Sequence, residues 1–266
     1  MATLFRRTRM PAASRRCDVD VLCAEDGIEV LESRVPDPGY TACLFPDPLG
    51  TGGAIFLASG QDNGRRRFSI SHELAHYHIP THRRAREQGL SCGERELHAN
   101  ATAADIEGEA NDFASELLMP AREFRLDLNV RDVSIATALQ LASDDFYDVS
   151  VTAAAWRMVQ VAKDPCALVV TSNGTIEWVV RSQALRVPGL RRGSIIPGDT
   201  LAWSGTQGGE SQTHPLEVDV EAWFQPQFPV RATLMESTHV IRSRAQVISL
   251  LWLVESDDQD LTSLPD

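Results

Sequence analysis

Residues 67–76 read RFSISHELAH and contain two histidines four positions apart, His72 and His76, with Glu73 directly after the first. Residues four apart on a helix lie about 40° apart around its axis, so both imidazoles can reach one ion from one face. Glu73 lies beside such an ion without having to ligate it, where it can accept a proton from a water molecule. The segment predicts a zinc metallopeptidase centre with metal ligands at His72 and His76 and a general base at Glu73. The competing interpretation is a surface helix with incidental histidines.

A third metal ligand is expected from residues 107–120, which read EGEANDFASELLMP. A catalytic zinc site takes three protein ligands and leaves the fourth position to water. Glu107 and Glu109 compete for this role. At about 100° per residue, Glu107 falls within the arc covered by the apolar residues from Phe113 to Leu118, whereas Glu109 lies outside it. We therefore predict Glu107 as the third ligand, because a metal explains a carboxylate on a buried face. The alternative is a half-exposed carboxylate in the first helical turn.

Other polar residues near the motif allow weaker assignments. Asn111 follows Glu107 by one turn, where it can hold a histidine or a water beside the metal, or be an ordinary surface residue. Tyr77, His78, His82 and His98 are candidates for stabilising an oxyanion. The alternative is that they are simply solvated. His214 and His239 are expected to be structural.

Hydrophobic periodicity and turn residues predict the elements around this centre. The expected elements are a short helix from Asp18, a strand around residues 28–31, a strand at residues 54–58, a metal helix beginning at Ser69 or Ser71 and ending at Pro80, and a second helix from Thr102 or Asp105 to Pro120. The stretch between the first two strands is rich in Gly and Pro, and the stretch after Pro80 is polar, so both are expected to be irregular.

Residues 134–161 contain two helical patterns, SIATALQLASDDF and SVTAAAWRMVQVA, with the spacing of a helix-turn-helix. We prefer a plain helical pair that caps the catalytic unit. The segment carries few cations and several aspartates, which suits DNA badly.

The composition becomes typical of β-structure after residue 164. The sequence ALVVTSNGTIEWVV predicts a hairpin with Asn173 and Gly174 at its turn, and further strands are expected at LEVDVEAWF, VRATLMEST and QVISLLWLV. The expected organisation is a disordered basic tail at 1–17, a metallopeptidase domain at 18–125, a helical extension at 126–163 and a smaller β-rich domain at 164–266.

Composition and charge exclude several classes of protein. Hydrophobic residues make up 43% of the 266 residues and no apolar run approaches the roughly 20 needed to span a bilayer. The formal net charge of -12 argues against an extended nucleic-acid interface, which needs a basic surface. Five scattered cysteines without a Cys-x-x-Cys pair indicate reduced thiols and a cytoplasmic protein. The arginine-rich first sixteen residues lack the hydrophobic segment of a secretion signal, so a disordered tail is expected, with a targeting peptide or an over-extended start as alternatives.

Both motif blocks, in this order, closely resemble the ImmA/IrrE family of metallopeptidases. The resemblance covers roughly residues 18–162 and implies a zincin-like α+β domain, with zinc held by His72, His76 and Glu107 and with Glu73 as base. It also implies a protein substrate, a helix-turn-helix transcriptional repressor, cut once to derepress stress or mobile-element genes. Some relatives carry a C-terminal sensory domain of GAF type, and the β-rich domain is a candidate for such a domain, although the resemblance itself fades after residue 162. Ala75 stands where many relatives have glycine, and the connector at 80–101 is long.

Two alternatives stay open at this point. The chain is either an endopeptidase or a zinc-containing regulatory module that sequesters a repressor without cleaving it. The presence of Glu73 disfavours the regulatory module, because a structural zinc site needs no base. The metal is expected to be Zn²⁺, although two imidazoles and a carboxylate also accept Mn²⁺ or iron. No membrane association is expected, and direct nucleic-acid binding is disfavoured.

Overall fold

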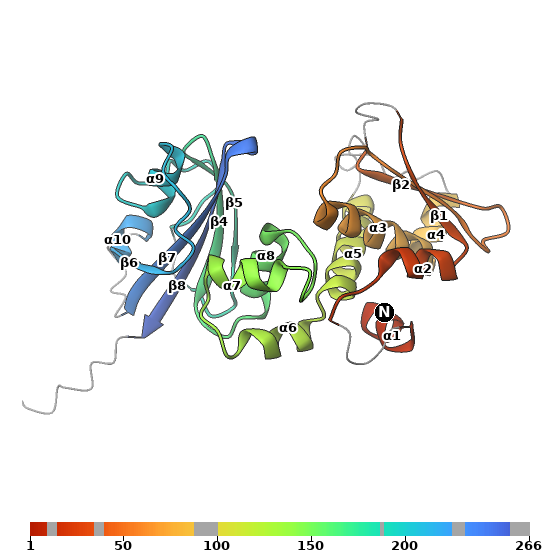
Figure 1. Cartoon of the computed structure of the whole chain (residues 1–266), viewed down its shortest axis with the longest axis horizontal. Helices are drawn as coiled ribbons and strands as arrows, with labels where there is room; N and C mark the ends of the chain where they lie inside the picture. The colour runs from red at the N-terminus through yellow and green to blue at the C-terminus, as the bar shows by residue number, and fades with distance from the viewer. Residues whose placement is uncertain (10–14, 35–39, 88–100, 187–188, 225–231, 256–266) are drawn as a thin grey trace, which may run out of the picture. The chain divides into compact units, whose positions relative to one another are not determined.

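The structure is a computed structural model that describes residues 1–9, 15–34, 40–87, 101–186, 189–224 and 232–255. Its internal contacts define two compact units (Figure 1). The first comprises Met1–Glu123 and Ala142–Ser150, and the second comprises Phe124–Leu141 and Val151–Asp266. Each unit combines helices with one sheet, so the protein has the expected mixed α+β class.

The first unit contains a three-stranded sheet in the order β1-β3-β2. Strands β1 (Ile28–Glu32) and β3 (Gly53–Leu57) are parallel, whereas β2 (Ala42–Pro46) is antiparallel to β3. No strand was expected at β2, because its five residues lie among glycines and prolines. Leu44 is nevertheless buried while Phe45 is exposed, as the alternation of a strand at a sheet edge requires. The apolar run is too short to stand out from its surroundings.

Helix α3 (Asn63–His78) carries the predicted histidines and begins six residues earlier than the expected Ser69. Its N-cap is Asp62, whose carboxylate accepts a hydrogen bond from the Arg65 amide at 2.9 Å. The expectation of a serine cap was wrong because both serines lie inside the helix. Ser71 donates back to the Arg67 carbonyl at 2.9 Å, as mid-helix serines do.

Three more helices of the first unit surround α3. Helix α2 (Val19–Glu25) has the expected cap at Asp18, which accepts from the Val21 amide at 3.2 Å. Helix α5 (Ala101–Leu118) is the predicted second helix and packs against α3. Helix α4 (Pro80–Glu87) replaces the first part of the expected irregular connector. Proline is favoured at the first position of a helix, so Pro80 both ends α3 and begins α4.

The N-terminal segment forms helix α1 (Ala2–Arg9), in contrast to the expected disordered tail. Its basic composition suggested disorder, but tertiary contacts with α5 order it. The Arg6 guanidinium is buried and donates to the Leu117 carbonyl at 2.5 Å. The Phe5 ring lies 5.8 Å from the Phe113 ring, and the Thr3 hydroxyl donates to Glu116 at 3.0 Å.

The second unit is built on a five-stranded sheet in the order β5-β4-β8-β7-β6, in which every neighbouring pair is antiparallel. From residue 124 on, it contains most of α6 (Ala121–Leu128) and of α7 (Ile135–Ala142). Its other elements are α8 (Val151–Val161), β4 (Cys166–Ser172), β5 (Thr175–Arg181), α9 (Leu201–Thr206), β6 (Leu216–Val218), α10 (Val220–Trp223), β7 (Ala232–Ile241), η1 (Arg242–Arg244) and β8 (Gln246–Glu255). The predicted hairpin joins β4 to β5, and Asn173 and Gly174 have φ values of 49° and 75°.

The strand expected over LEVDVEAWF is only partly correct. It ends at Val218, and Asp219 then caps the short helix α10 by accepting from the Glu221 amide at 2.9 Å. Aspartate after a short apolar run is a helix N-cap signal that the strand interpretation overlooked.

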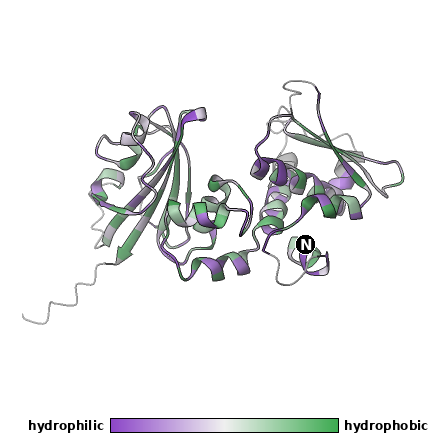
Figure 2. Ribbon diagram, viewed as in Figure 1, coloured by the Kyte–Doolittle hydropathy of each residue, from purple (hydrophilic) through white to green (hydrophobic). Residues whose placement is uncertain are grey.

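Both faces of the interior strand β4 are covered, which gives it a continuous buried run that is hydrophobic in Figure 2. Ala167 and Val169 point into a core that includes residues of α9 and α10, while α8 packs on β4 and β5. The α7 amide of Ile135 donates to the Ser237 hydroxyl of β7 at 3.0 Å. The helices of the expected capping pair, residues 135–141 and 151–161, therefore belong to the compact unit of the C-terminal sheet, whereas residues 142–150 between them belong to the first unit. Among the described residues, no helix is long and apolar enough to cross a membrane.

Candidate metal centre

Helix α3 presents the two motif histidines from a buried segment of the first unit. Leu74 and Ala75, which lie between them in the sequence, are fully buried, because α3 packs against α5 and against strands β2 and β3. His76 is 1% exposed, whereas the His72 side chain retains 16% exposure. The centre is thus buried at one histidine and reachable from solvent at the other.

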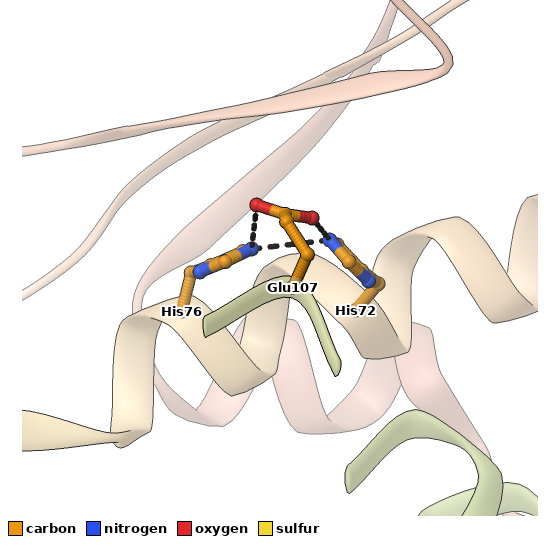
Figure 3. Close-up of side chains that lie close together, drawn as sticks. All are labelled: His72, His76 and Glu107. Atoms are coloured by element: carbon orange, nitrogen blue, oxygen red, sulfur yellow. Dashed lines mark hydrogen bonds and ion pairs between the residues drawn. The ribbon is translucent and has the colours of Figure 1, made fainter. Parts of the chain in front are cut away.

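The side chains of His72, His76 and Glu107 converge on one point (Figure 3). The two Nε2 atoms lie 3.1 Å apart. His72 Nε2 is 3.0 Å from Glu107 Oε2, and His76 Nε2 is 3.5 Å from Glu107 Oε1. A tetrahedral zinc ion with bonds of about 2.0–2.1 Å places neighbouring ligand atoms roughly 3.3 Å apart. The three side chains therefore have both the donor types and the spacing that such an ion requires.

Glu107 and Glu109 point to different partners, in agreement with the helical-arc prediction. Glu107 is oriented to the two Nε2 atoms, whereas Glu109 Oε2 lies 3.0 Å from His82 Nε2. Burial acts to raise the pKa of Glu107, but hydrogen bonds with His72 and His76 outweigh it and hold the pKa well below the usual range. Burial acts to lower the pKa of His72, but the interaction with Glu107 and further nearby groups outweigh burial and raise the pKa. The lowered pKa favours the ionised form of the Glu107 side chain, and a negative charge is what a cation-binding site requires.

Glu73 lies next to this cluster without joining it. Its side chain is 2% exposed, and its Oε2 atom accepts a hydrogen bond from the Leu44 amide of β2 at 3.0 Å. Burial acts to lower the pKa of His72, and the charge of Glu73 is one of the effects that outweigh burial and raise it. A fixed carboxylate beside the cluster is suitably placed to exchange protons with a molecule bound there.

Two further side chains hold the histidine rings in place. His72 Nδ1 lies 3.0 Å from Asn111 Oδ1, so Asn111 occupies the neighbouring position that its spacing predicted. His76 Nδ1 lies 3.1 Å from His82 Nδ1, and the sequence analysis missed this second contact. His82 is on α4, beyond the break at Pro80, and no helical period connects it to α3.

The other oxyanion candidates have partners away from the cluster. The Tyr77 hydroxyl donates to the Gly50 carbonyl at 3.1 Å. His78 Nε2 lies 2.7 Å from Asp26 Oδ2, and burial lowers the pKa of His78. His98 lies outside the described residues. In the second unit, His214 is exposed, and burial lowers the pKa of His239 on β7.

Among the described residues, no cysteine joins the metal-binding cluster. Of the residues that the structure describes, Cys17, Cys23, Cys43 and Cys166 form no disulfide, while Cys92 lies outside the described residues. Burial raises the pKa of Cys17 to about 11 and those of Cys23 and Cys166 to about 12. Such thiols stay protonated and unreactive near neutral pH.

The geometry described above is that of a metallopeptidase-like protein: two imidazoles four apart on one helix, a carboxylate from a second helix, and an unligated glutamate beside them. Comparison with known families agrees. Residues 23–158, just over half of the chain, match the model of the Peptidase_M78 family, described as the IrrE N-terminal-like domain. The chain belongs to this family, which confirms the resemblance to ImmA/IrrE proteins. It accordingly carries a metallopeptidase-like domain over residues 23–158.

The solved structures that match the chain include a Mycobacterium tuberculosis transcriptional regulator. The two share 18% sequence identity with a TM-score of 0.59, and the match covers 95% of this chain and 74% of the other. At this identity the likeness shows the fold alone, but its coverage extends to both units. No curated protein sequence matches the chain.

Proposed function

We propose that this protein is a zinc-dependent, site-specific endopeptidase that cleaves a partner helix-turn-helix repressor and so derepresses stress or mobile-element genes. The observation that carries the proposal is the convergence of His72, His76 and Glu107 beside the buried carboxylate of Glu73. A purely structural zinc site normally uses four protein ligands. Three ligands and an unligated carboxylate are the catalytic arrangement.

The residues fit the proposed metal on chemical grounds. Imidazole nitrogen and carboxylate oxygen are both zinc ligands, and their separations of 3.0–3.5 Å suit a small tetrahedral ion. The same donors accept Mn²⁺, which remains the second candidate. When bound, zinc would supply Lewis acidity, which would lower the pKa of a water molecule to about 7 and polarise a carbonyl.

The chain's own residues then have distinct roles. Glu73 accepts the proton of the attacking water, and the same carboxyl later delivers a proton to the leaving amine. The hydrogen bond from the Leu44 amide fixes one oxygen of Glu73, so the carboxylate does not have to be reoriented during the reaction. Asn111 holds the His72 ring through Nδ1, leaving Nε2 directed to the metal.

Strand β2 suits the binding of an extended substrate segment. It forms one edge of the three-stranded sheet, and it packs against α3. The Leu44 amide hydrogen-bonds Glu73, so this edge lies directly beside the proposed base. A peptide added alongside β2 by main-chain hydrogen bonds would pass beside Glu73 in the extended form that proteolysis requires.

The proposed regulatory role rests on the family and on the second unit. The family resemblance implies a repressor substrate, and a protein similar in fold is described as a transcriptional regulator. The antiparallel sheet with helices on both faces is the part that we propose to be GAF-like and to sense a signal. A cytoplasmic location is part of the proposal, supported by the scattered cysteines of the sequence.

Cleavage of the candidate repressor tests this proposal. Zinc-loaded wild-type protein, Glu73→Gln and the control Glu29→Gln, an exposed glutamate of β1, would each be mixed with a candidate helix-turn-helix repressor from the same organism. Fragments would be identified by mass spectrometry, and the metal content of each protein would be measured. We expect one cut by wild type and the control, and a loss of at least about a hundredfold in rate for Glu73→Gln with zinc retained.

Two results would contradict the proposal. Undiminished cutting by Glu73→Gln would remove the base from the mechanism. If zinc-loaded wild type and Glu73→Gln both bind the repressor tightly and neither cuts it, the protein is the alternative, a zinc-containing module that sequesters its partner.

A further inference from the structure

A second histidine-carboxylate pair lies directly behind the proposed metal ligand His76. His82 is 1% exposed, and its ring centroid lies 5.0 Å from that of His76. The two Nδ1 atoms are 3.1 Å apart, and His82 Nε2 is 3.0 Å from Glu109 Oε2. His76, His82 and Glu109 therefore form a continuous hydrogen-bonded chain from α3 through α4 to α5.

The direction of each hydrogen bond in this chain follows from the chemistry of the imidazole ring. A neutral imidazole has one donor nitrogen and one acceptor nitrogen. His76 Nε2 faces His72 and Glu107, so a metal bound there needs its lone pair, and the proton of His76 must be on Nδ1. His82 Nδ1 must then accept that N–H, which leaves the proton of His82 on Nε2. Glu109, a carboxylate acceptor, completes the chain without two donors or two acceptors meeting.

We propose that His82 and Glu109 are positioning residues, which fix His76 in the Nδ1–H tautomer with its Nε2 lone pair directed at the metal. This inference rests on the proposed zinc function and assigns roles to two residues outside the ligand set. A partner on the second nitrogen of a ligating histidine fixes the ring orientation and increases its basicity as a ligand. Here a neutral histidine transmits the effect of the carboxylate.

The two ligand histidines are thus held by different means. His72 Nδ1 has a direct amide acceptor, Asn111 Oδ1 at 3.0 Å. His76 is the more buried of the two and has a relay that ends on a partly exposed carboxylate, since the Glu109 side chain is 62% exposed. Glu107 and Glu109 are two residues apart on α5 and have different roles. Glu107 is a metal ligand, and Glu109 accepts the last hydrogen bond of the relay.

The break between α3 and α4 makes this contact possible. In one continuous helix, position 82 would lie about 240° around the axis from position 76 and about 9 Å along it. Instead Ile79 takes an extended conformation, with φ −81° and ψ 115°, and Pro80 starts a new helix. The chain turns at this point, and His82 is carried back against His76.

Zinc affinity measured by chelator competition on the full chain tests the proposal. His82→Leu removes the acceptor for His76 Nδ1–H, whereas His82→Asn keeps an acceptor oxygen near the same place. We expect His82→Leu to weaken zinc binding roughly ten- to a hundredfold and His82→Asn to recover most of that loss. His214→Leu, an exposed histidine of the second unit, is the control and should bind as wild type does. Circular dichroism would check that each variant is folded.

Glu109→Ala and Asp112→Ala form a second matched pair, because both remove one carboxylate from α5. Only Glu109 contacts His82, so only its variant should weaken zinc binding. The visible spectrum of the Co²⁺-substituted protein should also change with His82→Leu and Glu109→Ala, since the His76 ring is no longer fixed, and it should stay unchanged with both controls.

Nitrogen-15 NMR of the histidines in the wild-type protein keeps the proposal testable even if His82→Leu does not fold. We expect the Nε2–H tautomer for His82, and a proton on Nδ1 of His76 in the zinc-loaded protein. A proton on His82 Nδ1 would overturn the relay. So would zinc affinity within about threefold of wild type for a folded His82→Leu, or no recovery in His82→Asn. If wild type itself binds no zinc, the proposed function fails and the relay with it, whereas normal binding by every variant refutes the relay alone.

Discussion

Replacing Arg6 with leucine should destabilise the first unit, because the Arg6 guanidinium joins α1 to α5. It donates to the Leu117 carbonyl at 2.5 Å and to the Arg15 carbonyl at 2.8 Å. Leu117 is in the last turn of α5, where carbonyls have no partner within the helix. A hydrogen bond to a charged group contributes about 1.5–3 kcal/mol, and a buried carbonyl left without a partner costs about 1–3 kcal/mol. The cost of burying the guanidinium offsets part of this gain, so we expect a net loss of about 2–3 kcal/mol.

Thermal unfolding by circular dichroism and hydrogen exchange by mass spectrometry would measure this effect. The control is Arg7→Leu, since Arg7 is the exposed neighbour on the same helix. Arg6→Leu should lower the unfolding temperature of the first unit by roughly 4 °C per kcal/mol and speed exchange in residues 2–9, while Arg7→Leu should do neither. Equal behaviour of both variants and wild type, with unprotected amides in residues 2–9, would refute a docked α1.

Three further predictions concern stability. Gly64→Ala places a Cβ 2.5 Å from the backbone nitrogen of Ser150 and should lower the free energy of unfolding in urea by at least about 2 kcal/mol. Gly108→Ala, whose Cβ would have no atom within 4 Å, should instead stabilise α5 by about 0.5–1 kcal/mol. A hydrogen bond from Arg66 lowers the pKa of Asp20 in the folded protein. The contribution of this pair to the free energy of unfolding is therefore present above the unfolded pKa of about 3.9, and it is lost as pH falls through the lowered folded pKa. Asp20→Asn should therefore cost less than about 1 kcal/mol at pH 7 and nothing near pH 2. The fully buried carboxylate of Glu236 accepts hydrogen bonds from two amides of α9 and from the Trp223 indole N–H. In Glu236→Gln the side-chain NH₂ group would face one of these donors, so the free energy of unfolding should fall by about 2–3 kcal/mol. Tryptophan fluorescence would follow the unfolding.

The proximity of the proposed ligands follows mostly from local rules. The spacing of His72 and His76 fixes their common face once residues 63–78 are helical, and the arc calculation separates Glu107 from Glu109. Both steps use only the helical period. To expect α3 and α5 to lie side by side, one must also know that their apolar faces pack together. The amphipathic pattern of residues 106–118 indicated this packing.

The parts that the sequence analysis missed depend on contacts between distant segments. His82 reaches His76 only because the chain turns at Pro80, and Glu109 is 27 residues further along the chain from His82. Helix α1 has the composition of a solvated tail, and its order comes from burial of Arg6 against the end of α5. Strand β2 is too short for its alternation to be distinguished from the surrounding turns. Tertiary packing overrode local propensity in each case.

Units of the fold are equally difficult to delimit from composition. The change to β-structure after residue 164 is real, but residues 124–141 and 151–161 belong to the same compact unit as the sheet, and residues 142–150 belong to the first. Aspartates in the intervening segment suggested only a polar break. Asp148 in fact accepts a hydrogen bond from Asn63 at 2.8 Å and pairs with Arg16 at 2.9 Å, both in the first unit.

X-ray absorption at the zinc edge of the stoichiometrically loaded protein tests the central claim most directly, because it reports the ligands themselves. We expect a four-coordinate ion with nitrogen and oxygen ligands at about 2.0–2.1 Å, the outer-shell scattering of two imidazoles, and no sulfur. Glu107→Gln should alter the spectrum, whereas the control Glu29→Gln should not. Scattering from sulfur at about 2.3 Å, or an ion without imidazole ligands, would contradict a catalytic centre built from His72, His76 and Glu107.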